Sequence, residues 1–264
     1  MRGGVCLAVA GLLLASAPAW AGRPLMVDDA DPVDFRQCEF EAGTGYFYAP
    51  DCQHWELPFG LTYGLLPDLE FGLGFGGAFE ERTESLGETG REERIHASGI
   101  GDLTLGGKWR FLDETPWLPR QAMVVVVKLP TADEDKGLGS GKTDVDLTWV
   151  ASTALNDQTG VHLNAGYSWI GKLAEEEVGD VLHYGVALDY KISAPLQWVG
   201  EVFVDEGLRG GTDSVVQCNT GCRWQAADGL TLDLAVGTKI SGEAPDFTAT
   251  AGLTWAFGFT RIDN

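Results

Sequence analysis

The chain lacks any long apolar run after its first twenty residues, and it has few basic side chains. Its 18 lysines and arginines stand against 39 aspartates and glutamates, which gives a formal net charge of −21 at pH 7. This acidic excess argues against nucleic-acid partners, because phosphates are bound by basic patches. No later stretch reaches the roughly 18 uncharged apolar residues that a membrane-spanning helix needs, and none keeps a helical period. A chain of this kind can cross a membrane only with strands.

The N-terminus has the features of a secretory signal peptide. Arg2 precedes an apolar run over residues 5–15, and Ala19-Trp20-Ala21 then forms a small-x-small cleavage pattern. The apolar run is too short to span a bilayer, so it indicates export. We expect cleavage after Ala21, which makes residues 1–21 the signal peptide and leaves residues 22–264 as a single domain.

Period-two alternation of apolar with small or polar residues is abundant in the rest of the chain. Residues 247–259 place Phe247, Leu253 and Trp255 on one face, with mostly Thr and Gly on the other. Such a strand suits a wall between lipid and a water-filled lumen. The sequence therefore predicts an all-β fold, an antiparallel up-and-down transmembrane β-barrel of about twelve strands. The alternating segments lie near residues 36–48, 55–63, 69–79, 103–111, 123–129, 145–151, 161–169, 182–192, 196–204, 214–225, 230–236 and 247–259.

The connections between these segments alternate in length. Bacterial outer-membrane barrels have short periplasmic turns and longer outer loops. With both termini periplasmic, the strand count is even and the expected location is the outer membrane of a Gram-negative bacterium, in contact with its lipid. A secreted β-sandwich or lipocalin-like barrel is the alternative, but a sandwich usually has fewer and shorter strands. The predicted outer connections are residues 49–52, 80–97, 131–142, 172–180, 207–213 and 241–246, and the predicted turns are 65–68, 113–119, 156–160, 193–195 and 226–229.

Four cysteines follow the signal peptide, namely Cys38, Cys52, Cys218 and Cys222. In an oxidising compartment they allow three pairings, and we expect at least one disulfide. The local pairs Cys38 with Cys52 and Cys218 with Cys222 are slightly favoured. The second pair requires a turn over residues 219–221, because its Cα atoms would be about 13 Å apart on a continuous strand. We expect neither a metal site nor a cofactor.

Several motifs together resemble the outer-membrane family labelled "MetA-pathway of phenol degradation", also described as outer-membrane transporters. The resemblance implies an outer-membrane β-barrel, with a family function in the uptake of aromatic or other hydrophobic compounds. It extends over nearly the whole mature chain. The motifs are IGDLTLGGKWR at residues 100–110, VKLPT at 127–131, GLGSG at 137–141 with Asp144, HLNAGY at 162–167, VGEVF at 199–203 and AGLTWAF at 251–257.

The inward-facing positions hold many charges, which are our candidates for control of permeation. Unpaired charges in an interior are costly, so many of these side chains should form ion pairs. Between strands at residues 123–129 and 145–151, a hairpin should bring Lys128 close to Asp144 and Asp146. The predicted lumen acids are Glu39, Glu41, Glu56, Glu70, Asp102, Asp144, Asp146, Asp189, Glu201 and Asp233, and the predicted lumen bases are Lys108, Arg110, Lys128, Lys191, Arg223 and Lys239.

These observations predict a passive, narrow channel for small solutes, with aromatic and hydrophobic compounds among the candidates. The alternative is a closed-lumen barrel with a structural or surface-interaction role. A third possibility is an outer-membrane enzyme, since His162 and Asn164 suggest a phospholipase with a Ser-His-Asn site. Such an enzyme needs its site on the lipid side, whereas these residues face the lumen. We find no inward serine paired with these residues, interpret Ser152 and Ser168 as small wall residues, and expect no catalytic residues.

Overall fold

The computed structural model describes residues 22–50, 52–86, 91–136, 138–171, 179–208 and 214–258. The predicted signal peptide lies outside that part of the chain, as do residues 172–178 and 209–213 of two predicted outer loops and the residues after Gly258. Among the described residues, no helix has the length and apolar character needed to cross a membrane.

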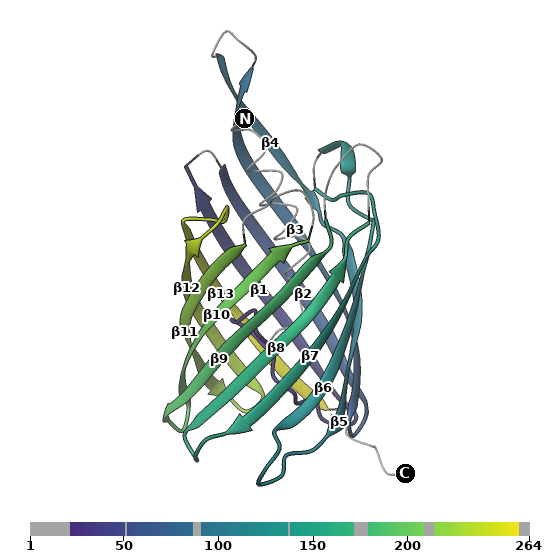
Figure 1. Cartoon of the computed structure of the whole chain (residues 1–264), viewed down its shortest axis with the longest axis vertical. Coiled ribbons are helices and arrows are strands. Elements are labelled where there is room, and N and C mark those ends of the chain that lie inside the picture. Colours follow the sequence, from purple (N-terminus) through teal and green to yellow (C-terminus); the bar gives the residue numbers. More distant parts are fainter. Residues whose placement is uncertain are drawn as a thin grey trace.

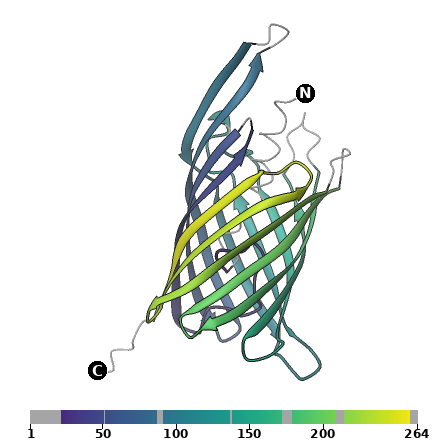
Figure 2. The ribbon, with the colours of Figure 1, turned by 90° about the vertical axis from the view of Figure 1, so that its left-hand side faces the viewer.

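Antiparallel strands close into a barrel of twelve strand positions (Figures 1 and 2). The sheet order runs from β2 through β1 and β13 back to β3, and pairing of β2 with β3 closes the ring. β4 and β5 share one position, since β3 pairs with β5 in its first part and with β4 in its second. The predicted fold and the even count are confirmed. The strands are β1 (Gln37–Ala49), β2 (Cys52–Leu66), β3 (Leu69–Leu86), β4 (Arg91–Ile100), β5 (Leu103–Leu112), β6 (Arg120–Leu129), β7 (Asp144–Ala154), β8 (Thr159–Trp169), β9 (Val181–Ser193), β10 (Leu196–Gly207), β11 (Val215–Ala227), β12 (Leu230–Ser241) and β13 (Phe247–Gly258).

Side chains on each strand alternate between the outer surface and the lumen, as the period of two requires. On β9, Val186 is 40 % exposed and Leu188 is 39 % exposed, whereas Ala187 between them is 1 % exposed. The outer surface also carries large aromatic side chains, including Trp109 and Trp255. An apolar, aromatic outer surface of this kind matches the lipid-facing band of outer-membrane barrels.

Most connections at one rim are tight turns, and most connections at the other rim, which we call the outer rim, are longer. The exceptions are residues 50–51, which join β1 to β2 at the outer rim, and residues 113–119, which join β5 to β6 at the other rim. The turn between β11 and β12 uses Asp228-Gly229, a sequence that favours two-residue hairpins. Gly229 has a φ of +71°, and a Cβ there would lie 2.4 Å from the carbonyl oxygen of Ala256. A short 3-10 turn, η2 (Glu134–Lys136), lies in the connection between β6 and β7.

The predicted outer loop over residues 80–97 is wrong. β3 continues to Leu86 and pairs with β4 from Gly77 opposite Ile100 to Leu86 opposite Arg91. This β-hairpin projects beyond the outer rim (Figure 1). A two-stranded ribbon that projects from a barrel need not bury an apolar face, so its sequence can lack the alternation that predicts a strand.

Neither favoured disulfide pair forms, because Cys38, Cys218 and Cys222 are free thiols. With these three thiols free, no disulfide joins any two of the four cysteines that follow the signal peptide. Strand β11 runs through Cys218 and Cys222 without the turn that their pairing requires. In the β1–β2 hairpin, Cys52 lies opposite Ala49, whereas Cys38 lies opposite Tyr63 at the other end. Cys38 and Ala49 are eleven residues apart along β1, which corresponds to roughly 36 Å at about 3.3 Å per residue. Cys52, opposite Ala49, is therefore too far from Cys38 to pair with it.

A charge in the middle of the outer surface should destabilise the folded barrel. The alternation in the sequence predicts that Trp149, Leu163, Leu188 and Leu232 face lipid. The substitution Leu188→Arg should therefore cost about 2–4 kcal/mol of folding free energy in a bilayer. The matched control is Ile192→Arg, which lies on the same face near the end of β9 and should cost about 0–1 kcal/mol. Equal stability of the two variants in bilayer unfolding measurements would show that this face does not contact the hydrocarbon.

Candidate functional site

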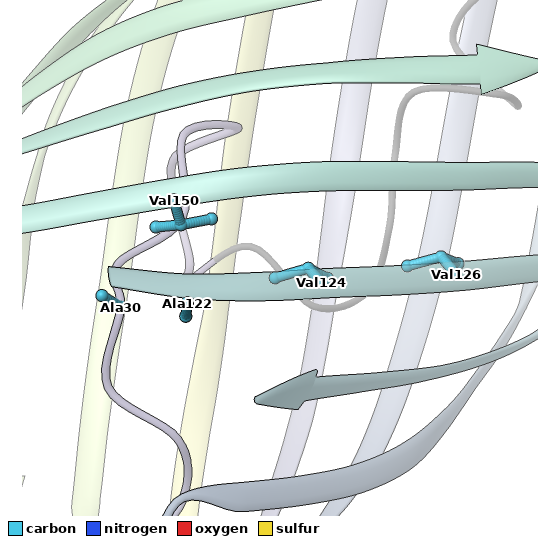
Figure 3. Close-up of a cluster of buried hydrophobic side chains, with 5 residues drawn as sticks. All are labelled: Ala30, Ala122, Val124, Val126 and Val150. Carbon is cyan, nitrogen blue, oxygen red and sulfur yellow. The ribbon is translucent and has the colours of Figure 1, made fainter. Parts of the chain in front are cut away.

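Residues 22–36, which lead into β1, run through the inside of the barrel, an arrangement that the sequence did not predict. We call these residues the lumen segment. Its Ala30 is fully buried against inward-facing side chains of β6 and β7, namely Ala122, Val124, Val126 and Val150 (Figure 3). A second buried cluster joins Leu25 and Val27 of the segment to Ala187, Val199 and Phe203 of β9 and β10. The segment is therefore packed as a core element.

The backbone of the lumen segment is held by an inward carboxylate of β10. Both oxygens of Glu201 accept a hydrogen bond from Met26 N at 2.9 Å, and Oε2 also accepts one from Val27 N at 2.8 Å. Asn219 on β11 donates to Glu201 Oε1 at 2.6 Å. Glu201 was predicted to face the lumen, and its partner is the chain's own N-terminal backbone. Hydrogen bonds from amides to a carboxylate are charge-assisted and therefore strong.

Two arginines fix the start of the lumen segment. Arg23 Nε lies 3.2 Å from Asp233 Oδ2 on β12, which places the predicted lumen residue Asp233 in an ion pair. Arg223 on β11 donates to the backbone oxygens of Gly22 and Arg23. The guanidinium of Arg23 lies against Gly43 of β1, where a Cβ would approach it to 2.4 Å. The absence of a side chain at this position therefore makes room for Arg23.

Lys108 of β5 forms the most buried ion pairs of the site. Its Nζ lies 3.0 Å from Asp28 Oδ1 of the lumen segment and 3.9 Å from Glu70 Oε1 of β3. Glu70 also accepts a hydrogen bond from Val33 N. All three residues are at most 5 % exposed. Lys108 thus links the wall of the barrel to the lumen segment through compensated charges.

A chain of hydrogen bonds crosses β7, β8 and β9 beside the lumen segment. Ser152 Oγ accepts from Ala30 N at 2.9 Å and lies 2.9 Å from His162 Nδ1, while His162 Nε2 lies 2.7 Å from Asp189 Oδ2. The interpretation of Ser152 as a small wall residue without a paired histidine was wrong. Ser152 is 1 % exposed and its oxygen is engaged by Ala30, so the chain holds the segment in place.

The connection between β6 and β7 closes over a charged cluster at the outer rim. Lys128 Nζ contacts Asp144 Oδ2 at 2.5 Å and lies 3.6 Å from Asp102 Oδ2. Asp102 also accepts hydrogen bonds from Thr131 N and Ala132 N at 2.9 Å. The cluster thus joins Lys128 to Asp144 as expected, with Asp102 as its second carboxylate. It ties the connection to the barrel wall.

Asp146 does not join this cluster, which corrects the expected grouping with Lys128. It lies two residues further along β7, and His183 Nε2 of β9 is 2.7 Å from its Oδ2. Ser168 and Thr148 donate to the same carboxylate at 2.6 Å. The outer-rim lysine is therefore balanced by Asp102 and Asp144, while Asp146 has its own histidine partner.

At the opposite rim, arginines surround the exit of the lumen segment. Asp31 pairs with Arg110 at 3.1 Å and with Arg120 at 2.7 Å. Arg120 also approaches Glu114 at 3.4 Å. Hydrogen bonds from Thr153 Oγ1 and Ala154 N hold the pKa of Glu114 below its usual range.

Two predicted lumen lysines lie away from these contacts. Lys239 pairs with Asp246 at 2.8 Å beside the connection from β12 to β13. Lys191 is exposed near the end of β9. Neither belongs to the group of side chains that holds the lumen segment.

Residues 58–257 match the family model "Putative MetA-pathway of phenol degradation". The chain belongs to this family. The match confirms the resemblance found in the sequence motifs. A search of curated proteins gives no match.

Solved structures with the same fold include outer-membrane channels and porins. A COG4313 outer-membrane channel from Pseudomonas putida F1 has 17 % identity and a TM-score of 0.63, with 87 % of this chain and 98 % of that chain covered. The NanC porin has 7 % identity and a TM-score of 0.57, with 82 % and 98 % covered. The CymD monoaromatic hydrocarbon channel has 11 % identity and a TM-score of 0.50, with 87 % and 90 % covered. The barrel therefore resembles the channels and porins of the Gram-negative outer membrane.

Proposed function

We propose that the protein is a passive outer-membrane channel for small solutes, in which the lumen segment sets the width of the path. The observation that carries this proposal is the pairing of lumen charges with residues 22–36. Arg23, Asp28 and the amides of Met26 and Val27 each engage an inward side chain of the wall. A solute must pass between this segment and the wall, so the path is narrow.

The comparisons support a transport role without naming a solute for this chain. The COG4313 protein is described as an outer-membrane channel, and CymD is described as a monoaromatic hydrocarbon channel. The family model refers to phenol degradation. We therefore propose small aromatic or other hydrophobic compounds as the solute class, and propose no enzymatic activity.

Single-channel recording of the refolded protein in planar bilayers tests the proposal. We expect small, steady conductance steps, because the lumen segment leaves limited water in the barrel. Liposomes loaded with a small aromatic compound should release it faster when they contain the protein. Silence in both measurements would support a closed-lumen scaffold, a function that the packed lumen segment also favours.

Ion selectivity should depend on the outer-rim cluster. Lys128→Met removes the ammonium shared by Asp102 and Asp144, so the uncompensated carboxylates should attract cations and raise the cation preference. Asp144→Asn should lower it. The matched control is Lys136→Met, which changes the net charge equally in the same connection but at a side chain that is 58 % exposed. Reversal potentials across a salt gradient measure the effect, and equal values for Lys128→Met and Lys136→Met would contradict it.

A further inference from the structure

The lumen segment begins with a turn, and the first glycine of that turn is held by its carbonyl group. The backbone oxygen of Gly22 accepts a hydrogen bond from the guanidinium of Arg223 and a second one, at 3.4 Å, from Leu25 N. In the sequence, Gly22 directly follows Ala19-Trp20-Ala21, the small-x-small pattern that ends the predicted signal peptide. Cleavage at this pattern would therefore leave the first residue of the mature chain at a fixed position inside the barrel.

A carboxylate lies next to this position. A Cβ atom on Gly22 would lie 3.6 Å from Asp29 Oδ2 and 3.4 Å from a guanidinium nitrogen of Arg223. Asp29 Oδ1 accepts a hydrogen bond from Asp31 N at 2.9 Å, whereas Oδ2 has no hydrogen-bond donor and no ion pair among the described residues. Asp29 Oδ2 can therefore accept a further donor from the direction of Gly22.

A free N-terminus at Gly22 would bring a charged donor to this oxygen. In a terminal glycine, rotation about the Cα–C bond can carry the nitrogen to the place that a Cβ would occupy, because both atoms are bonded to Cα at similar lengths and angles. The carbonyl group does not move in this rotation, so its hydrogen bonds are kept. The α-ammonium would then lie about 3.6 Å from Asp29 Oδ2. Before cleavage, the same nitrogen is an uncharged amide and cannot form an ion pair.

The charges around Gly22 favour an added positive charge. Asp29 and Glu39 of β1 are within electrostatic range of each other and of Arg223. The other basic side chains near Asp29 and Gly22 already have carboxylate partners, namely Arg23, Lys108 and His162. Two carboxylates therefore share one guanidinium. An α-ammonium supplies the second positive charge, and its repulsion from Arg223 is offset by the two carboxylates.

We propose that cleavage after Ala21 frees the α-amino group of Gly22 inside the lumen, and that its ammonium forms an ion pair with Asp29 that fastens the start of the lumen segment. A signal peptidase adds water across the peptide bond between Ala21 and Gly22. The hydroxyl goes to Ala21, which becomes a carboxylic acid, and the hydrogen goes to the nitrogen of Gly22. The acid then releases a proton and the amine binds one, so charge is conserved. Removal of the signal peptide thereby completes the contacts of the lumen segment, whether or not the barrel conducts.

The reactivity of the α-amino group tests the ion pair. N-terminal sequencing of protein purified from the outer membrane should begin at Gly22. Acetylation by N-hydroxysuccinimidyl acetate at pH 7, followed by peptide mass spectrometry, then reports the fraction of uncharged amine, because the ammonium does not react. An opposite charge within about 4–6 Å shifts a pKa by about one unit or more, so Asp29→Asn should speed acetylation about tenfold. The matched control Asp34→Asn removes the same charge from an exposed residue of the lumen segment and should leave the rate unchanged.

A second variant keeps Asp29 and moves the ammonium instead. Insertion of Ser-Gly between Ala21 and Gly22 makes the mature chain start two residues earlier, so its amine should be acetylated about as fast as that of Asp29→Asn. Equal rates for the unmodified protein, Asp29→Asn and the insertion variant would overturn the proposal, as would a mature chain that begins at a residue other than Gly22. None of these measurements depends on conductance, so they can fail while the channel stands, and the channel can fail while the ion pair stands.

Discussion

Deleting residues 24–33 should raise the single-channel conductance several-fold. These residues occupy the lumen and bury Leu25, Val27 and Ala30 against the wall, so their removal widens the water-filled path. The twelve strand positions are hydrogen-bonded to one another without the segment, so the barrel should still close. Planar bilayer recordings of the refolded variant give the conductance. The control shortens the β3–β4 hairpin outside the barrel by removing residues 82–95, which should leave the conductance unchanged.

A reversible lock tests the same idea without a deletion. Ala30→Cys with Ser152→Cys places two thiols where Ala30 N now donates to Ser152 Oγ at 2.9 Å. Cys38, Cys52, Cys218 and Cys222 are replaced by serine to prevent other pairings. If the lumen segment moves during conduction, reduction should raise the conductance of the oxidised protein. A deletion variant with the conductance of the unmodified protein would show that current does not pass the segment.

The barrel was predictable because its physical cause is repeated along the chain. Each strand separates lipid from lumen, so side chains of opposite character alternate with the period of the backbone. The lumen segment has no such repeat, and residues 22–36 gave no period at all. One sign of it was present in β6, where residues 122–127 read AMVVVV and so place apolar side chains on both faces of the strand. A strand that is apolar on both faces is covered on both faces, and here Val124 and Val126 face the lumen segment.

Among the lumen contacts, only those between neighbouring strands could be predicted, because the strand register decides which residues lie opposite each other. Lys128 and Asp144 are direct partners in the β6–β7 ladder, which a hairpin between them requires. Ser152 and His162 are also direct partners, across β7 and β8. That pairing depends on where the turn starts, and a shift of one residue moves every side chain to the other face. Contacts made by the lumen segment depend on its path through the barrel, which no local pattern specifies.

Lys108 should be the most sensitive charged residue of the lumen. Its ammonium lies among Asp28, Glu70 and the carbonyl oxygen of Asp31, and it is 5 % exposed. Removing one partner of a buried ion pair leaves an uncompensated charge in a medium of low dielectric, which costs more than the pair itself contributes. Here the loss would leave two buried carboxylates close together, so their repulsion adds to the cost.

Lys108→Met should therefore lower the free energy of unfolding by about 3–5 kcal/mol. Urea unfolding of the protein in bilayers, followed by tryptophan fluorescence, measures the change. The control Lys191→Met removes the same charge from an exposed position near the end of β9 and should change stability by less than about 0.5 kcal/mol. Adding Asp28→Asn to Lys108→Met should restore part of the loss, because one of the two carboxylates becomes neutral. Equal losses for Lys108→Met with and without Asp28→Asn would show that Asp28 and Lys108 are not energetically coupled, and that the lumen segment is held by its other contacts.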